Sequence, residues 1–327
     1  MNKRMIYLIS LIAEMGQKLT IPQIYSKKFE SSGNEYLSPT EKIRIEDMTD
    51  FFVTAGIVGR TEVLPIIGKD GGRAIELEPD VIGGQYPYSA SDLIEVKAGV
   101  PTFTQTGSEI PSIEQLEAKG SRIIAAALRN RFEKQCVDVF FKGTYKDKDG
   151  KVLEVGTKSD KTLNWNGKTK IADEIFALAL EYQTKHQEFP KIEVGSTIFN
   201  ALKNEALVVN QNLNGVRFVY GDNPYIELNG GLRIDLLVGA KGTDDKLVDP
   251  KDLMVFYSLK TLAVGYGCLM YGDVKSNTSH LVKAKTISGD LRVEEMTGSA
   301  GLWGKSAPMP LILAVDKFRR YKVTISE

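Results

Sequence analysis

Histidine and cysteine side chains are well suited to binding metal ions or to nucleophilic chemistry, and this chain has two of each. They are His186, His280, Cys136 and Cys268. Neither histidine has a cysteine or an acidic residue at the spacing of a metal site, so both are interpreted as surface side chains. Each cysteine lies in an apolar stretch, which predicts a buried, reduced thiol. We therefore expect no metal site and no disulfide.

The common phosphate-binding and hydrolase motifs are also missing. Gly304-Lys305-Ser306 lacks the upstream glycine of a phosphate-binding loop, and Asp147-x-Asp149 lacks the further ligands of an EF-hand loop. The chain has no Gly-x-Ser-x-Gly turn, no His-Glu-x-x-His motif and no Cys-x-x-Cys pair. These absences favour a protein with no enzyme activity and no cofactor. A soluble two-domain enzyme that uses carboxylates, which no motif would reveal, stays as one alternative.

The charge balance separates the chain from proteins that bind duplex DNA tightly. It has 42 basic and 42 acidic residues among 327, whereas tight DNA binders usually carry a basic excess. No apolar run reaches the roughly 20 residues that span a bilayer, so we expect no membrane contact. The apolar residues from Met5 to Met15 follow a basic start, as in a signal peptide, but no good cleavage site follows them. Their helical spacing favours a docking helix.

A long amphipathic helix is the strongest structural signal. Ser112 and Gln115 have capping-box spacing, and Gly143 supplies a stop. Between these signals apolar residues recur at helical spacing, at Ile113, Leu116, Ile123, Ile124, Ala127, Leu128, Phe132, Cys136, Val139 and Phe140. The pattern predicts one helix over 113–142, with a length of about 45 Å.

The segments before this helix have the composition of extended chain. The polar stretch 31–40 predicts an irregular arm, followed by strands at 42–45 and 51–58. The region from Thr61 to Gln105 holds a short strand at 74–77, and glycines and prolines interrupt it every few residues. Such a composition suits a long two-stranded excursion with little core of its own, and long loops of this kind are usually functional.

The segments after the helix alternate strand and helix. Asp149-Gly150 lies between two short strands within 142–155 and predicts a hairpin. An α/β unit is expected from Ile171 to Leu281. Its predicted helices are 172–187 and 197–205, and its predicted strands are 191–194, 216–220, 226–228, 232–238 and 253–257. Strands at 311–315 and 321–325 are expected to close a small sheet.

This order of segments, together with short local matches, resembles the major head protein family of lambda-like tailed bacteriophages. The matching stretches are Thr40-Glu41-Lys42 before Ala55-Gly56-Ile57-Val58, Gly71-Gly72 before Glu76-Leu77-Glu78-Pro79, Lys142-Gly143-Thr144-Tyr145, Tyr266-Gly267-Cys268, Ser306-Ala307-Pro308, Leu311-Ile312-Leu313 and Asp316-x-Phe318. Each match is short, but they follow one another in order over about residues 40 to 325.

The resemblance implies an α+β, HK97-like tailed-phage capsid fold. Its parts would be an N-terminal arm at 1–50, an extended E-loop at 51–110, a spine helix at 111–143, a peripheral domain at 144–170 with 282–327, and an axial domain at 171–281. The E-loop would lie over a neighbouring subunit. Its inter-subunit contact residues would be Gly68, Lys69, Asp70, Gly71, Gly72, Arg73 and Glu76.

The function implied is that of a major capsid protein. Pentamers and hexamers would form an icosahedral head, assembled in the bacterial cytoplasm and carried in the virion. Portal, scaffolding and decoration proteins would be partners, and the shell would enclose double-stranded DNA without binding it specifically. Zero net charge suits a shell that should not bind its DNA tightly, because the DNA must be pumped in and later ejected. The runner-up is an encapsulin-like nanocompartment shell protein, which shares the fold.

Overall fold

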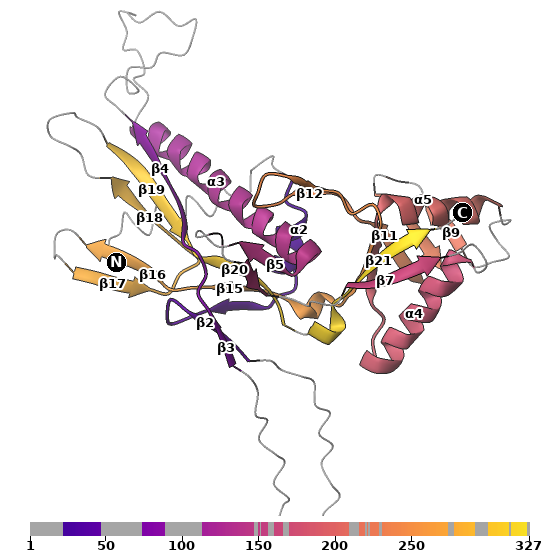
Figure 1. Cartoon of the computed structure of the whole chain (residues 1–327). Helices are drawn as coiled ribbons and strands as arrows, with labels where there is room; N and C mark the ends of the chain where they lie inside the picture. The colour runs from indigo at the N-terminus through magenta and orange to yellow at the C-terminus, as the bar shows by residue number, and fades with distance from the viewer. Residues whose placement is uncertain are drawn as a thin grey trace, which may run out of the picture.

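The computed structural model of the chain describes residues 22–46, 74–88, 113–146, 150, 152–155, 160–165, 170–208, 216–219, 221, 223–228, 231–273, 278–291, 300–313 and 315–325. Figure 1 shows an elongated molecule. Helices α4 (Ile171–His186) and α5 (Ser196–Val208) lie at one end, and strands β16 (Leu269–Asp273) and β17 (Thr278–Val282) lie at the other. Among the described residues, no helix has both the length and the apolar character that crossing a membrane requires.

The long helix α3 (Ile113–Lys142) confirms the bounds expected from the sequence. It ends at Gly143, which adopts a φ of +69° and donates its N–H to the Val139 carbonyl at 2.8 Å. A left-handed residue at this position is easiest for glycine, so the stop signal has the predicted cause. The last part of α3 is buried on most sides, and Cys136 and Phe140 are fully buried there.

A seven-stranded sheet forms the core of one end of the molecule. Its strands in spatial order are β7 (Asp160–Trp165), β21 (Arg319–Ile325), β14 (Leu253–Tyr257), β8 (Lys191–Val194), β11 (Leu232–Leu236), β10 (Tyr225–Leu228) and β9 (Val216–Val219). Helices α4 and α5 cover one face through Ile175, Tyr182 and Leu202, all fully buried. The helices and strands expected between 171 and 257 are thus confirmed, within a few residues. We call this sheet with α4 and α5 the sheet lobe.

The remaining described elements, with α3, make up what we call the body. One of its sheets consists of β1 (Glu35–Leu37), β15 (Leu262–Tyr266) and β20 (Pro308–Ile312), and a second consists of β18 (Thr286–Leu291), β19 (Ala300–Ser306) and β4 (Ile82–Tyr88). The described residues of the body also form four two-stranded ribbons. They are β2 (Ile43–Glu46) with β3 (Ala74–Leu77), β5 (Thr144–Lys146) with β6 (Val152–Glu154), β12 (Ala240–Lys241) with β13 (Leu247–Val248), and β16 with β17. The hairpin expected within 142–155 is confirmed as β5–β6, although its residues 147–149 lie outside the described ranges.

The packing crosses the segment boundaries expected from the sequence. Strands β7 and β21 come from outside 171–281, yet both belong to the seven-stranded sheet, where β21 pairs parallel with β7 and antiparallel with β14. The expectation that 311–315 and 321–325 close one small sheet is wrong, because β20 pairs with β15 in the body instead. Which sheet a strand joins depends on its pairing with strands that are distant in sequence, and the residues of the strand itself carry little information about that pairing.

Strand β14 joins the two cores of the molecule. Its side chains alternate between the two faces of the sheet, as in any strand. Met254 and Phe256 belong to the core under α4 and α5, whereas Val255 and Tyr257 belong to the core around the end of α3. All four are buried. The sheet therefore has a helix-covered face and a face that packs directly on the body.

Strand β4 contradicts the expectation that 61–105 has almost no part in the subunit core. It pairs antiparallel with β19, with Ile82 opposite Ser306. Ile82 is buried with Ile124 and Leu302 against α3. The glycines and Pro87, which look like strand breakers in the sequence, are tolerated because β4 is an edge strand of its sheet.

The arm expected at 31–40 is also more regular than its composition suggests. Helix α2 (Tyr25–Glu30) precedes it, and β1 pairs parallel with β15 along 35–37. Tyr25 and Phe29 are fully buried, which ties this segment to the body core. The docking helix expected at 5–15, the strand expected at 51–58 and the expected contact residues 68–73 lie outside the described ranges.

Candidate subunit-contact surfaces

The two cysteines confirm the expectation of buried, unpaired thiols. Cys136 is fully buried on α3, and Cys268 is 5% exposed in the body. Burial raises the pKa of the Cys136 thiol well above its ordinary value, and the nearby carboxylates of Glu133 and Glu30 raise it further. A buried thiol that resists ionisation is a poor nucleophile. Neither cysteine therefore has the surroundings of a reactive residue.

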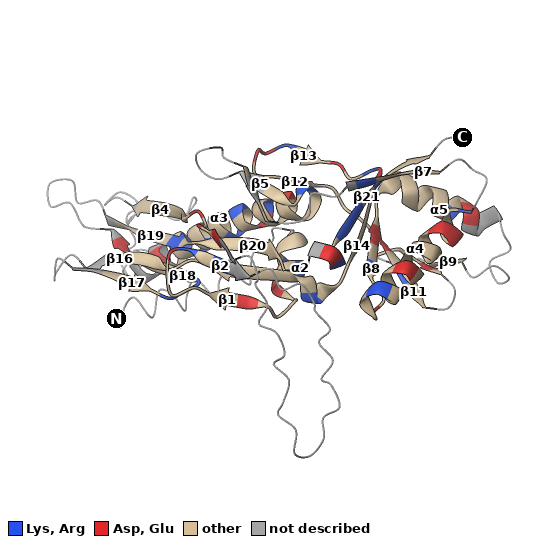
Figure 2. Cartoon of the chain, turned by 60° about the horizontal axis from the view of Figure 1, so that its bottom comes forward, with Lys and Arg blue, Asp and Glu red and all other residues tan. Residues whose placement is uncertain are grey.

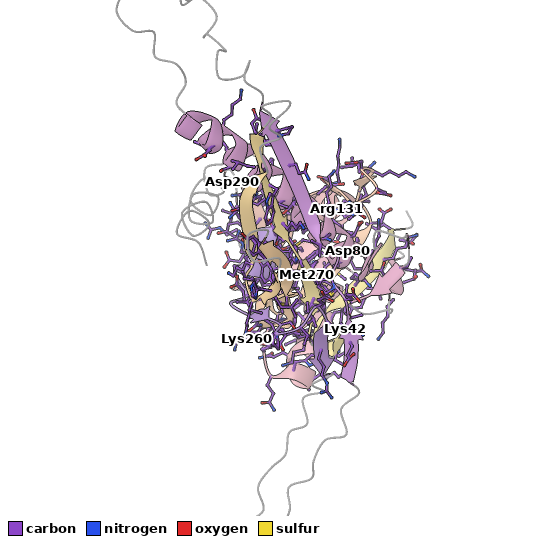
Figure 3. All side chains as sticks on the ribbon, turned by 90° about the vertical axis from the view of Figure 1, so that its left-hand side faces the viewer. Lys42, Asp80, Arg131, Lys260, Met270 and Asp290 are labelled. Atoms are coloured by element: carbon purple, nitrogen blue, oxygen red, sulfur yellow. The ribbon has the colours of Figure 1, made fainter. Side chains whose placement is uncertain are left out.

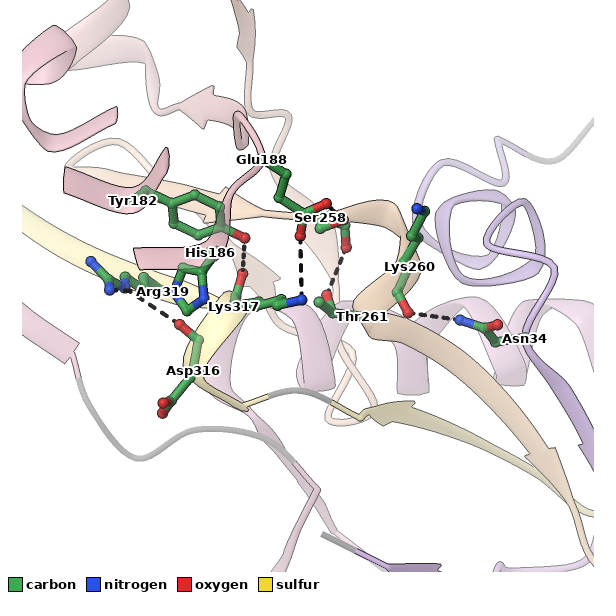
Figure 4. Close-up of polar contacts among 10 residues, drawn as sticks. All are labelled: Asn34, Tyr182, His186, Glu188, Ser258, Lys260, Thr261, Asp316, Lys317 and Arg319. Carbon is green, nitrogen blue, oxygen red and sulfur yellow. Dashed lines mark hydrogen bonds and ion pairs between the residues drawn. The ribbon is translucent and has the colours of Figure 1, made fainter. Parts of the chain in front are cut away.

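His186 corrects the prediction that both histidines are surface side chains. It lies at the end of α4 but is only 9% exposed, with its ring 4.6 Å from the ring of Tyr182. Its Nε2 is 3.5 Å from a guanidinium nitrogen of Arg319, and Figure 4 shows the two side chains next to each other. Burial lowers the pKa of His186, and the positive charges of Arg319 and Lys185 lower it further. The other histidine, His280, is exposed on β17 as expected.

The fragment that resembles part of a phosphate-binding loop belongs to a strand. Gly304, Lys305 and Ser306 belong to β19 and pair with residues of β18 and β4, so they form no phosphate-binding loop. The Ser306 hydroxyl donates to the Lys285 carbonyl at 2.6 Å. Within the described ranges, no cluster of histidine, cysteine and acidic residues could hold a metal ion.

A cavity of about 800 Å³ opens beside α4 in the sheet lobe. Its lining residues are Phe176, Phe189, Pro190, Lys191, Ile192, Gly231, Leu232, Arg233 and Asp235. Arg233 and Asp235 pair with each other at 2.7 Å, and Phe189 is 52% exposed. The cavity is therefore open, its lining is polar and apolar in similar measure, and the charges of Arg233 and Asp235 neutralise each other.

A second apolar surface lies at the opposite end of the molecule. Met270 and Leu281 face each other across β16 and β17, and each is 56% exposed. Val81, just before β4, is 59% exposed, and a cavity of about 160 Å³ is lined by both Val81 and Met270. Figure 3 looks at this end of the molecule, with Met270 labelled. We call Val81, Met270 and Leu281 the end patch; exposed apolar groups that gather together often mark contact sites.

The ribbon β2–β3 carries the only expected contact residue among those the structure describes, Glu76. Glu76 lies opposite Arg44 in the ribbon, and its carboxylate is 3.9 Å from the Lys42 ammonium. Both side chains of this ion pair are more than half exposed, at 58% and 59%, so the pair leaves the ribbon surface accessible. The ribbon leads into 47–73, which includes the expected contact residues 68–73.

Charges of both signs are distributed over both lobes. In the cartoon of Figure 2, positions of Lys and Arg (blue) and positions of Asp and Glu (red) are scattered along both lobes. The junction between the lobes is an exception, because the charged side chain of Glu193 is buried there and its partner Lys28 is only partly exposed. Lys28 of α2 pairs with Glu193 of β8, and Tyr257 of β14 donates to the same carboxylate at 2.6 Å. The sequence offers no local signal for this group of three.

The chain is similar to one protein family along most of its length. The model of the family described as phage major capsid protein E matches residues 20–316. No curated protein sequence matches the chain.

Solved structures share the fold at low sequence identity. A protein described as the capsid protein of a prophage in E. coli CFT073 matches with a TM-score of 0.57 and 14% identity over 98% of this chain and 99% of that chain. A chain from Microbacterium phage Oxtober96 matches with a TM-score of 0.50 and 12% identity, over 94% and 92% of the two chains. The holo-SrpI encapsulin complex from Synechococcus elongatus PCC 7942 matches at 0.46 and 9%, over 93% and 90%. The fold is the HK97-like α+β fold that the resemblance implies.

Proposed function

The chain belongs to the phage major capsid protein E family, and from this membership we propose how it builds a phage head. It is a structural major capsid protein of an icosahedral shell, and its place is the capsid of the virion. We propose that the subunit is lambda-like and that pentamers and hexamers assemble in the host cytoplasm around double-stranded DNA. The observation that carries the proposal is the family match over 20–316, which includes α3, α4 and α5.

We further propose that the sheet lobe is the axial domain, which surrounds the capsomer centre, and that α3 is the spine helix of the body. The elongated shape supports this arrangement, because the sheet lobe and the β16–β17 ribbon lie at opposite ends (Figure 1). The axial domain would then differ from 171–281, because β7 and β21 pair within its sheet, whereas β15 and β16 belong to the body.

Two surfaces are proposed to contact other copies of the chain. The first is the segment beyond the β2–β3 ribbon, with contact residues Gly68, Lys69, Asp70, Gly71, Gly72, Arg73 and Glu76. The exposure of Glu76 and the outward position of the ribbon support this role. The second is the end patch. If the sheet lobe surrounds the capsomer centre, the opposite end of the subunit must face a copy in the next capsomer.

We propose that the protein has no enzyme activity, cofactor or metal. The burial of both thiols supports this, because the chain then lacks an accessible nucleophile of that type. Portal, scaffolding and decoration proteins are the proposed partners. The DNA inside would be held without specific contacts, and the zero net charge of the chain suits this.

Electron microscopy of the purified recombinant protein tests the assembly. Closed particles are the expected result, and a monodisperse monomer at all concentrations would contradict the proposal. Particles that contain a protein cargo and no DNA, when isolated from the native host, would instead favour an encapsulin-like compartment.

The contact segment has its own test. A variant in which a short Gly-Ser linker replaces 68–73 should keep the circular dichroism and thermal midpoint of the unassembled subunit, but it should form no closed particles. An unfolded variant would place the segment in the subunit core. A variant that assembles normally would remove its contact role.

A further inference from the structure

Helix α2 lies between the two lobes and is attached firmly to the body. The Glu133 carboxylate on α3 accepts the backbone N–H groups of Ile24, Tyr25 and Ser26, at 3.1, 2.9 and 2.8 Å. The Tyr25 ring packs against Phe140 with 5.2 Å between centroids. One carboxylate that accepts from consecutive residues fixes both the position and the direction of the helix start.

The same short helix also binds the sheet lobe. The Lys28 ammonium pairs with the Glu193 carboxylate of β8, and the Tyr25 hydroxyl donates to the carbonyl of Val238, which follows β11. The first contact reaches β8, and the second reaches the chain just after β11, the strand that pairs with β8. Thus α2 connects the spine helix to the sheet lobe by polar contacts on both sides.

The charges in this connection are largely removed from water. Glu193 is 6% exposed on the sheet face that packs on the body, where Val255 lies directly opposite it in β14. The Lys28 nitrogen lies 4.7 Å from the ring centroid of Tyr25 and 4.8 Å from that of Phe140. Tyr257 donates its hydroxyl proton to the second Glu193 oxygen at 2.6 Å. Each buried charge therefore has partners in fixed directions.

A buried ion pair of this kind adds little net stability compared with apolar side chains of the same volume, because removing both charges from water offsets their attraction. It differs from an apolar contact in its directionality. Apolar surfaces can slide over one another, whereas a carboxylate shared by an ammonium and a hydroxyl has one good geometry. A polar contact between two packed cores is thus suited to fixing their relative orientation.

We propose that α2 sets the angle between the sheet lobe and the body, with Lys28, Glu193 and Tyr257 as the positioning residues. This inference rests on the proposed function, because in a shell the angle within each subunit determines how neighbouring subunits tilt. A subunit whose lobes can rotate would join its neighbours at variable angles, and its shells would vary in diameter.

The test is a double variant that removes both charges and keeps the shapes, Lys28→Met with Glu193→Gln. The amide oxygen can still accept from Tyr257. We expect a thermal midpoint within about 4 °C of the wild type. We also expect a broader distribution of shell diameters in electron micrographs and, for the unassembled subunit, an altered scattering profile in small-angle X-ray measurements.

A matched control removes an exposed ion pair by the same kinds of substitution, a lysine to methionine and a carboxylate to its amide. Lys185 and Asp316 are 3.3 Å apart and 52% and 73% exposed, so Lys185→Met with Asp316→Asn should change neither the shells nor the scattering profile. Double-variant shells of wild-type diameter and spread would overturn the proposal. Failure of the double variant to fold would also overturn it, because the pair would then serve stability. If the wild type forms no shells, the proposed function fails, and the scattering comparison still tests the angle.

Discussion

Replacement of Gly304 by alanine tests the packing of α3 on the β18–β19–β4 sheet. A Cβ atom at Gly304 would lie 2.6 Å from Cγ2 of Ile124, which is 2% exposed on α3. Carbon atoms in good contact are about 3.5–4.0 Å apart, so the added methyl overlaps Ile124 by about 1 Å. The helix and the sheet must move apart, or Ile124 must leave its preferred rotamer.

The expected change in the free energy of unfolding is the difference of two opposing effects. Overpacking of a well-packed core costs about 1–3 kcal/mol. Replacing glycine by alanine restricts the unfolded chain, which stabilises the folded protein by about 0.4–1 kcal/mol. We therefore expect Gly304→Ala to lower the free energy of unfolding by about 1.3 kcal/mol, the difference between the midpoints of the two ranges. Urea titration of the unassembled subunit, followed by circular dichroism, measures this.

Gly84→Ala is the matched control, because Gly84 lies opposite Gly304 in the neighbouring strand. A Cβ atom at Gly84 meets nothing within 4 Å, so this variant should be as stable as the wild type or slightly more stable. Adding Ile124→Ala to Gly304→Ala should remove the overlap, with a favourable coupling of about 1 kcal/mol in the double-mutant cycle. Wild-type stability of Gly304→Ala, or the absence of coupling, would refute the steric argument.

Other predictions concern α3, α2 and His186, which is drawn in Figure 4. Leu128→Pro, in the interior of α3, should abolish shells in electron micrographs, because an interior proline costs about 3 kcal/mol and bends the helix; shells of normal size would contradict a continuous spine. Glu133→Ala leaves the first N–H groups of α2 without their acceptor and should lower the free energy of unfolding by about 2–3 kcal/mol, with Glu133→Gln intermediate and Glu181→Gln, at an exposed position, as a control. The folded protein holds the pKa of His186 below its ordinary 6.5, so the unfolded chain takes up the proton first. Stability should therefore fall as the pH drops through 6.5, and His186→Gln should weaken this dependence; an unchanged pH profile would argue against it.

The parts of the fold that could be predicted from the sequence are those with a local physical cause. Helix α3 has a cap, an apolar stripe and a terminal glycine within one continuous segment, so its bounds could be predicted. The sequence also predicts the bounds of β3, β8 and β14, because each is a short segment with strand-forming apolar residues between turn signals.

The parts that could not be predicted depend on partners that are distant in sequence. Strand β4 looks like loop, since Gly83, Gly84 and Pro87 interrupt it, and only its pairing with β19 and its burial against α3 make it a strand. His186 looks like a surface residue until α4 packs beside Arg319. Tertiary contacts override local propensity in both places.

The candidate contact surfaces also include features that the sequence can predict and features that it cannot. The end patch combines Val81 with two residues of the β16–β17 ribbon, and nothing in the local patterns links these segments. The ion pair between Lys28 and Glu193 joins residues 165 positions apart. The extended segment that includes 68–73 was singled out by its composition, and its contact role stays a prediction.

The position of β21 has a consequence for the order of folding. This strand lies between β7 and β14, so β7 joins the sheet only through β21. Asp160 of β7 pairs with Arg320 of β21, and the long segment between them must close before the two strands can meet. We therefore expect β7 to join the sheet late in folding. Anything that displaces β21 also detaches β7, so this edge of the sheet lobe depends on a single strand.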